Sequence, residues 1–168
     1  MKDYSFGDTS YYSLVRKEGT LRITVQAVYE GSTIYGTDIN FILDTGAYLT
    51  VVSRGTAIKC HFDRLPKKQT TLFGFSGGIA ADFVRIPGLR VLDRLYTDVP
   101  VLIPHDMYRI HPESGEKKQM SDVLGLNILS YYDFCVDSTD DRLYLKETAN
   151  PIFYNEILRS GQIFTMGE

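Results

Sequence analysis

Apolar residues along the chain fall into short runs that are separated by glycine, proline and aspartate. Leu21, Ile23 and Val25 alternate with Arg22 and Thr24, and this period of two predicts a strand with one buried face. Comparable runs recur at close intervals along the rest of the sequence. Many short strands at such spacing are typical of a small barrel or sandwich, so we expect a mostly β fold.

The same patterning predicts the remaining elements. Further strands are expected over residues 33–43 (after a turn at 31–32 and with a break at 36–38), 49–52, 70–75, 79–84, 89–92, 99–103, 134–136 and 143–145. One short helix is expected over residues 54–62, and another in the tail from Pro151, where apolar residues recur at helical spacing. The polar stretch 105–120 is expected to be a loop or an insertion. Together these elements predict a single domain over residues 1–168, with a core at about 20–147, an N-terminal extension at 1–19 and a C-terminal tail at 148–168.

Composition and charge narrow the class of protein. The 168 residues are 43% hydrophobic and 23% charged, which is typical of one globular domain with a proper core. A net charge of −3 leaves no basic surplus to neutralise phosphates, so no nucleic-acid partner is expected. The sequence contains no run of about 20 apolar residues, so no membrane span is expected either. A cytoplasmic location is the expectation.

The cysteine and histidine residues give little indication of disulfides, a metal site or a catalytic role. Cys60 and Cys135 are too few for a disulfide framework, and two buried or half-buried thiols in a reducing compartment are the favoured interpretation, with one bridge as the alternative. The adjacent pair Cys60-His61 lacks a second spaced pair of ligands, so no metal and no other cofactor is expected. No nucleophile motif accompanies His61, His105 or His111, and none of them is assigned a catalytic role.

The sharpest chemical feature is Asp44-Thr45-Gly46-Ala47, which lies between the apolar runs 41–43 and 49–52. A carboxylate placed between two buried strands is costly unless it is hydrogen-bonded or paired, and such groups are candidates for function. Gly46 allows the backbone to approach the carboxylate closely and to take unusual dihedral angles, and the Thr45 hydroxyl can bond to backbone. Taken alone the tripeptide is also a common turn. The apolar runs on both sides favour the functional interpretation.

The segment 41–47, followed by Val51-Val52-Ser53, resembles the active-site strand and turn of the retropepsin-like aspartic proteases. Residues 123–129 resemble the apolar-apolar-glycine segment that opens the C-terminal helix of that family and lies under its active-site loop. Residues 133–137 and 142–145 resemble the strand pair that follows. The order of these elements makes the resemblance more specific than any one of them, and it covers about residues 21–146.

The resemblance implies a closed, mostly β acid-protease barrel with a β-hairpin flap and a short C-terminal helix. Asp44 would be the catalytic residue, and its loop would be supported by Thr45, Gly46 and Ala47. The residues expected to lie under the active site are Gly125 and Asn127.

The flap, which would contact the substrate, is expected at Gly74, Phe75, Ser76, Gly77 and Gly78. Glycines at the tip of a hairpin permit both a tight turn and mobility. For this segment taken alone, an ordinary surface hairpin is the alternative.

Peptide hydrolysis by this chemistry needs two neighbouring carboxylates, and the chain contains one Asp-Thr-Gly. The other similar segment, Asp137-Ser138-Thr139, lacks the glycine. We therefore expect an aspartic endopeptidase that is a homodimer, with one Asp44 from each chain and a peptide or protein as substrate. A catalytically silent dimerisation or peptide-binding module is the alternative, and an enzyme that processes only itself or one partner is a third.

Two positions depart from the family pattern. Tyr48 and Leu126 stand where viral relatives carry the two members of an ion pair near the dimer interface. Because both members are absent together, the dimer is expected to pack differently in detail.

Overall fold

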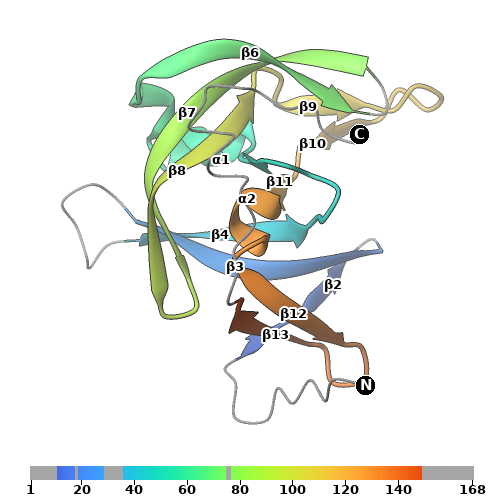
Figure 1. The fold of residues 1–168 in the computed structure, drawn as a ribbon. Coiled ribbons are helices and arrows are strands. Elements are labelled where there is room, and N and C mark those ends of the chain that lie inside the picture. The colour runs from blue at the N-terminus through green and yellow to red at the C-terminus, as the bar shows by residue number, and fades with distance from the viewer. Residues whose placement is uncertain (1–10, 18, 29–35, 75–76, 149–168) are drawn as a thin grey trace.

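The computed structural model describes residues 11–17, 19–28, 36–74 and 77–148, and Figure 1 shows their fold. The strands are β1 (Tyr11–Ser13), β2 (Val15–Lys17), β3 (Thr20–Val28), β4 (Gly36–Leu43), β5 (Thr50–Val51), β6 (Lys67–Gly74), β7 (Gly77–Val91), β8 (Arg94–Pro104), β9 (Tyr108–Ile110), β10 (Lys117–Gln119), β11 (Asp122–Leu124), β12 (Tyr132–Asp137) and β13 (Arg142–Glu147). The helices are α1 (Arg54–Lys59), the 3-10 turn η1 (Phe62–Arg64) and α2 (Leu126–Leu129). The expected mostly β fold is confirmed.

Eight strands form one mixed sheet in the order β2-β3-β4-β11-β5-β8-β7-β6, and a further pairing joins β3 to β7. This last pairing turns the sheet back on itself as a ring, because β7 pairs with β6, β8 and β3 along its length. Closure of that ring into a complete barrel stays a prediction. Strands β1, β13 and β12 form a second, small sheet at the opposite end of the molecule from β6 (Figure 1).

The alternating pattern of β3 is confirmed, since Ile23, Val25 and Ala27 are buried. The partner strand β4 differs from expectation, because it runs unbroken from Gly36. Residues 36–38 pair in register with residues 26–28 of β3, and these cross-strand bonds hold the polar stretch extended. The turn expected at residues 31–32 lies outside the described residues.

Strand β7 joins two strands that were expected to be separate. It continues through Pro87, which is skipped in the register with β8: Ile86 pairs with Val99 and Gly88 with Thr97. A proline has no N–H to donate, but the strand passes it because the residues on either side are paired.

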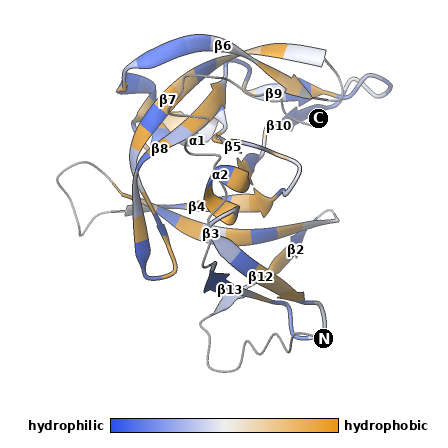
Figure 2. Cartoon of the chain, in the orientation of Figure 1, coloured by the Kyte–Doolittle hydropathy of each residue, from blue (hydrophilic) through white to orange (hydrophobic). Residues whose placement is uncertain are grey.

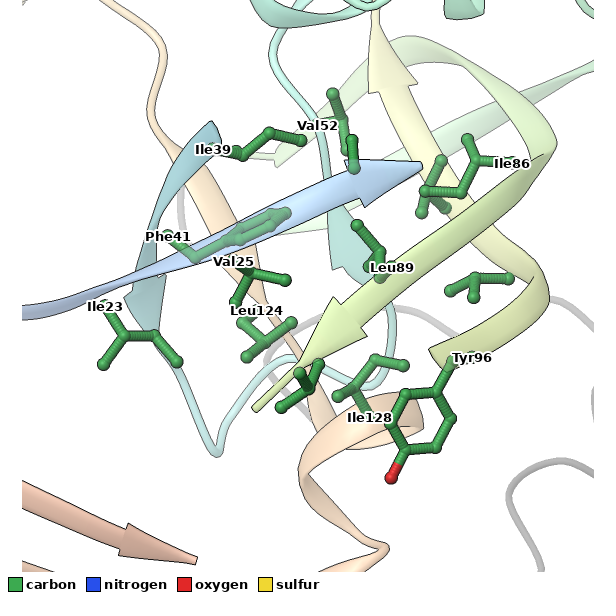
Figure 3. Close-up of a cluster of buried hydrophobic side chains, with 14 of the residues drawn as sticks. Ile23, Val25, Ile39, Phe41, Val52, Ile86, Leu89, Tyr96, Leu124 and Ile128 are labelled. Carbon is green, nitrogen blue, oxygen red and sulfur yellow. The ribbon is translucent and has the colours of Figure 1, made fainter. Parts of the chain in front are cut away.

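The core lies between β3, β4, β7 and α2. Figure 3 shows Phe41, Leu89, Leu124 and Ile128 converging there, and Figure 2 shows apolar residues concentrated on β3, β4 and α2. Burial of a side chain of this size contributes about 1.5–3 kcal/mol.

Two segments hold more regular structure than expected. The stretch 105–120 forms an antiparallel hairpin, β9–β10, in place of a loop. The N-terminal stretch contributes β1, which pairs with β13, and β2, which pairs with β3. The short helix expected over 54–62 is confirmed for 54–59 by α1, and the chain then turns at His61, whose φ is 60°, into η1. The strands expected over 134–136 and 143–145 pair as the hairpin β12–β13.

The helix expected from Pro151 lies outside the described residues. Among the described residues, no helix combines the length and the apolar character needed to cross a membrane.

Candidate active site

Asp44 lies at the end of a strand in the middle of the large sheet. Strand β4 ends at Leu43, whose register partner in the parallel strand β11 is Leu124. The Asp44 N–H then donates to the Leu124 carbonyl, at an N–O distance of 3.2 Å. On its other side β11 pairs with β5, through Val123 and Val51. The loop of residues 44–49, the Asp44 loop, therefore leaves and re-enters the sheet on either side of β11.

The Asp44 carboxylate is held by its own loop. Its Oδ1 accepts a hydrogen bond from the Gly46 N–H at 2.8 Å, and the Asp44 carbonyl accepts one from the Ala47 N–H at 3.3 Å. A Cβ on Gly46 would lie only 3.1 Å from Oδ1. The glycine thus permits this close approach, whereas the unusual dihedral angle expected there is not seen, because Gly46 is not among the residues with positive φ.

The loop presents its tip to solvent and its base to the core. Asp44 is half-buried, Thr45 and Gly46 are exposed, and Ala47 is fully buried. None of the ion pairs among the described residues involves Asp44. The acid is therefore anchored through backbone contacts while its surroundings remain open to a further group.

Helix α2 begins directly under this loop, and Gly125 and Asn127 lie at its start. The Leu126 N–H donates to the Ala47 carbonyl at 2.8 Å, and the Asn127 N–H donates to the Tyr48 carbonyl at 3.0 Å. A Cβ on Gly125 would lie 2.6 Å from the carbonyl carbon and oxygen of Leu49. Only glycine fits this contact, because real Cβ atoms do not approach backbone so closely.

The Asn127 side chain joins α2 to two strands of the sheet, β5 and β8. Its Oδ1 accepts from both the N–H and the hydroxyl of Thr50 at 2.9 Å, and its Nδ2 donates to the Pro100 carbonyl at 2.9 Å. The Thr50 hydroxyl also accepts from the Gly125 N–H at 3.1 Å. Every group in this network is buried, so the end of the Asp44 loop is held rigidly.

The sequence analysis did not predict the role of Asp122, whose carboxylate binds the start of α1. Its two oxygens accept from the Ser53 N–H and from the Thr56 hydroxyl, both at 2.7 Å. Burial raises the pKa of Asp122, and the bonds from Ser53 and Thr56 act in the opposite direction. Ser53 is also the N-cap of α1. Asp122 lies 69 positions from Ser53, so the contact between them could not be predicted from the sequence.

The glycine-rich segment lies at the end of a regular hairpin. Gly74 of β6 pairs with Gly77 of β7, and Phe73 pairs with Gly78. Gly77 has a φ of +100°, which a side chain rarely tolerates, and a Cβ on Gly78 would lie 2.8 Å from Thr71 Cγ2. The two other residues of the predicted flap, Phe75 and Ser76, lie outside the described residues.

His105 contacts an aspartate other than Asp44. His105 Nε2 lies 2.9 Å from Oδ1 of the buried Asp82 on β7, a contact that the sequence did not predict. Cys60 is a buried free thiol, whereas Cys135, also expected to be buried or half-buried, is an exposed one because it lies on the small sheet. Within the part of the chain that the structure describes, no group of three or more His, Cys, Asp or Glu residues is arranged to hold a metal ion.

Comparison with protein families gives a match over residues 31–131, more than half of the chain, to the family described as "gag-polyprotein putative aspartyl protease". The chain belongs to this family. The match includes Asp44, the glycine hairpin, Gly125 and Asn127. The resemblance to retropepsin-like aspartic proteases is thereby confirmed.

One solved retropepsin-like structure shows that this chain has the same fold. A retropepsin-like aspartic protease from Rickettsia conorii matches with a TM-score of 0.53 and 16% identity, over 86% of this chain and 96% of that one. The EIAV protease, in complex with the inhibitor HBY-793, matches with a TM-score of 0.47 and 20% identity, over 68% of this chain and 89% of that one. No curated protein sequence matches.

Proposed function

We propose that this chain is an aspartic endopeptidase, and that its active form is a homodimer in which two Asp44 carboxylates, one from each chain, activate a water molecule. The observation that carries the proposal is the placement of Asp44. It is half-buried at the start of a loop whose tip, Thr45 and Gly46, is exposed, and it lies over a buried network that holds the loop in position.

Two carboxylates are needed because each has a different task. One is ionised and takes a proton from water, while the other is protonated and polarises the scissile carbonyl. Neighbouring carboxylates cannot both ionise, so the pair shares one proton and titrates as a unit, as is known for aspartic protease dyads.

The second carboxylate has to come from another chain. The Asp137-Ser138-Thr139 segment forms the turn between β12 and β13, where Asp137 Oδ1 accepts from the N–H groups of Thr139 and Asp140 at 2.9 and 3.1 Å. That carboxylate stabilises a turn in the small sheet, whereas Asp44 belongs to the large one. A two-fold axis beside the exposed Thr45 and Gly46 brings two Asp44 loops together.

The β6–β7 hairpin serves in this proposal as the flap over the bound peptide. Its glycines and its location at the edge of the large sheet favour movement. The substrate is an extended peptide or an unfolded segment of a protein, which such sites bind as an added strand.

A peptide-library cleavage assay read by mass spectrometry, at several pH values and high protein concentration, tests this function. We expect wild type to cut at defined sites and the Asp44→Asn variant to be inactive while still dimeric in sedimentation. Asp98→Asn is the matched control, because Asp98 is exposed and its φ of 52° suits asparagine.

Three outcomes count against the proposal. Equal cleavage by wild type and Asp44→Asn points to a contaminant. Cleavage by a species that remains monomeric contradicts the two-chain site. If the wild-type protein is dimeric but cleaves no peptide of the library, a binding module of the same fold is favoured.

A further inference from the structure

The insertion hairpin (residues 105–120) is anchored beside both parts of the candidate active site. At its start the His105 N–H donates to the Ala80 carbonyl at 3.0 Å, and the His105 ring contacts the buried Asp82. Ala80 follows Gly77 by three positions along β7, so this anchor lies close to the glycine end of the proposed flap.

At its other end the hairpin leads directly into β11. Gln119 of β10 precedes Asp122 by three positions, and the register partner of Asp122 is Phe41, three positions before Asp44. At about 3.3 Å per residue, with about 4.8 Å between neighbouring strands, this path from Gln119 to Asp44 is at most about 25 Å. An extended peptide of about eight residues spans the same distance.

One face of this hairpin is apolar and exposed. Tyr108 and Ile110 alternate with Arg109 and so share a face, and they are 53% and 64% exposed. The neighbouring Met107 is also exposed. Leaving such side chains in water forgoes the stabilisation that burial gives elsewhere in the fold, so a surface of this kind is typical of a binding site.

The hairpin strands are also basic. They carry Arg109, Lys117 and Lys118 and no carboxylate, in a chain whose net charge is −3. The carboxylates of the insertion, at Asp106, Glu113 and Glu116, lie outside the two strands. Lys117 is the register partner of Ile110 and therefore borders the apolar face.

We propose that this face is a specificity site for the substrate, at a distance from the scissile bond. Tyr108 and Ile110 contact a bulky apolar side chain of the bound peptide, and Lys117 pairs with an adjacent acidic residue. Lys117 lies two positions further from Asp122 than Gln119 does, so the contact falls within about ten residues of the cleaved bond. In the view of Figure 1, β9–β10 and the glycine end of β6–β7 extend to the same side of the molecule. This inference rests on the proposed protease function.

The test compares cleavage preferences of the wild-type protein with those of Tyr108→Ser/Ile110→Ser and of Lys117→Glu. We expect wild type to favour peptides with a bulky apolar residue beside an acid at one distal position. The double variant loses the apolar preference, with kcat/KM for matching peptides falling about tenfold. Lys117→Glu replaces the preference for an acid by one for a base. Peptides truncated short of this position are cut equally by all forms.

Matched controls are Phe134→Ser and Lys146→Glu on the small sheet, where both residues are exposed. They should leave every preference unchanged. If wild type and both hairpin variants cleave peptides with the same preferences, this inference is wrong, while the proposed protease function stands. A change in dimer dissociation without a change in preference also overturns it and assigns the face to the contact between copies. Absence of any cleavage by wild type overturns both the inference and the proposed function.

Discussion

Asn127 accepts hydrogen bonds at 2.9 Å from both the backbone N–H and the hydroxyl of Thr50, although the two residues are 77 positions apart. Because Asn127 lies in α2 and Thr50 opens β5, this pair fixes the end of the Asp44 loop to the element beneath it. The Asn127 amide also donates to Pro100 of β8. The network uses neutral groups only, so it positions the loop without adding charge beside Asp44.

Asn127→Ala is expected to lower the free energy of unfolding by about 2–4 kcal/mol, because it leaves the buried Thr50 and Pro100 groups without partners. Urea denaturation measures the change. Asn40→Ala is the control, since Asn40 is exposed on β4 and its loss should cost less than about 0.5 kcal/mol. Similar losses for the two variants would contradict the network described above.

Gly125→Ala is expected to destabilise the fold by more than about 2 kcal/mol, because its Cβ would overlap the Leu49 backbone. The Asp44 loop would shift, so cleavage should fall as well. Gly55→Ala in α1 is the matched control. There the nearest atom, at 3.0 Å, is the end of the flexible Gln119 side chain, and helix propensity favours alanine by up to about 1 kcal/mol. Thermal unfolding measures both changes: Tm should fall for Gly125→Ala and should not fall for Gly55→Ala.

The pH dependence of stability should report the buried Asp122. Its pKa is raised in the folded state, chiefly by burial, so folding is opposed once the carboxyl ionises. Relative to an Asp122→Asn variant, wild type should lose stability as pH rises from about 3.8 through the raised pKa, and the difference should then level off. Urea unfolding of both proteins across this range gives the difference. A difference that grows in favour of wild type over the same interval would contradict the assignment.

The two thiols should differ in reactivity. Burial, followed by the negative charge of Asp122, raises the pKa of Cys60 to about 11, and the thiolate is the form that reacts. Iodoacetamide at pH 8 should therefore label the exposed Cys135 in the folded protein and leave Cys60 intact. Mass spectrometry of the labelled protein checks this, and unfolding in urea should make both sites react. A Cys135→Ser variant that is still labelled rapidly would show that Cys60 is accessible.

The pattern of apolar and polar residues was sufficient to predict strands whose side chains alternate between a buried and an exposed face. The alternation at residues 21–25 predicts β3 because side chains on a strand alternate between faces. The predictions differed from the structure where a cross-strand partner decides the conformation. Residues 36–38 look like a break but form strand because β3 lies beside them. Residues 105–120, expected to be a loop or an insertion, contain a hairpin because β9 and β10 pair with each other.

The residues alone were enough to predict the family, through Asp44-Thr45-Gly46 and the later Gly125 segment, because these residues meet steric and hydrogen-bonding demands that few others can satisfy. The resemblance also led us to expect Asn127 under this loop, but the partners of its side chain and the contacts of Asp122 came from the fold. Asn127 binds Thr50, 77 positions away, and Asp122 binds Ser53, 69 positions away, and no periodicity in the sequence predicts such a contact. Hydrogen bonding requires the two partners to be close in space, and the fold alone brings them together.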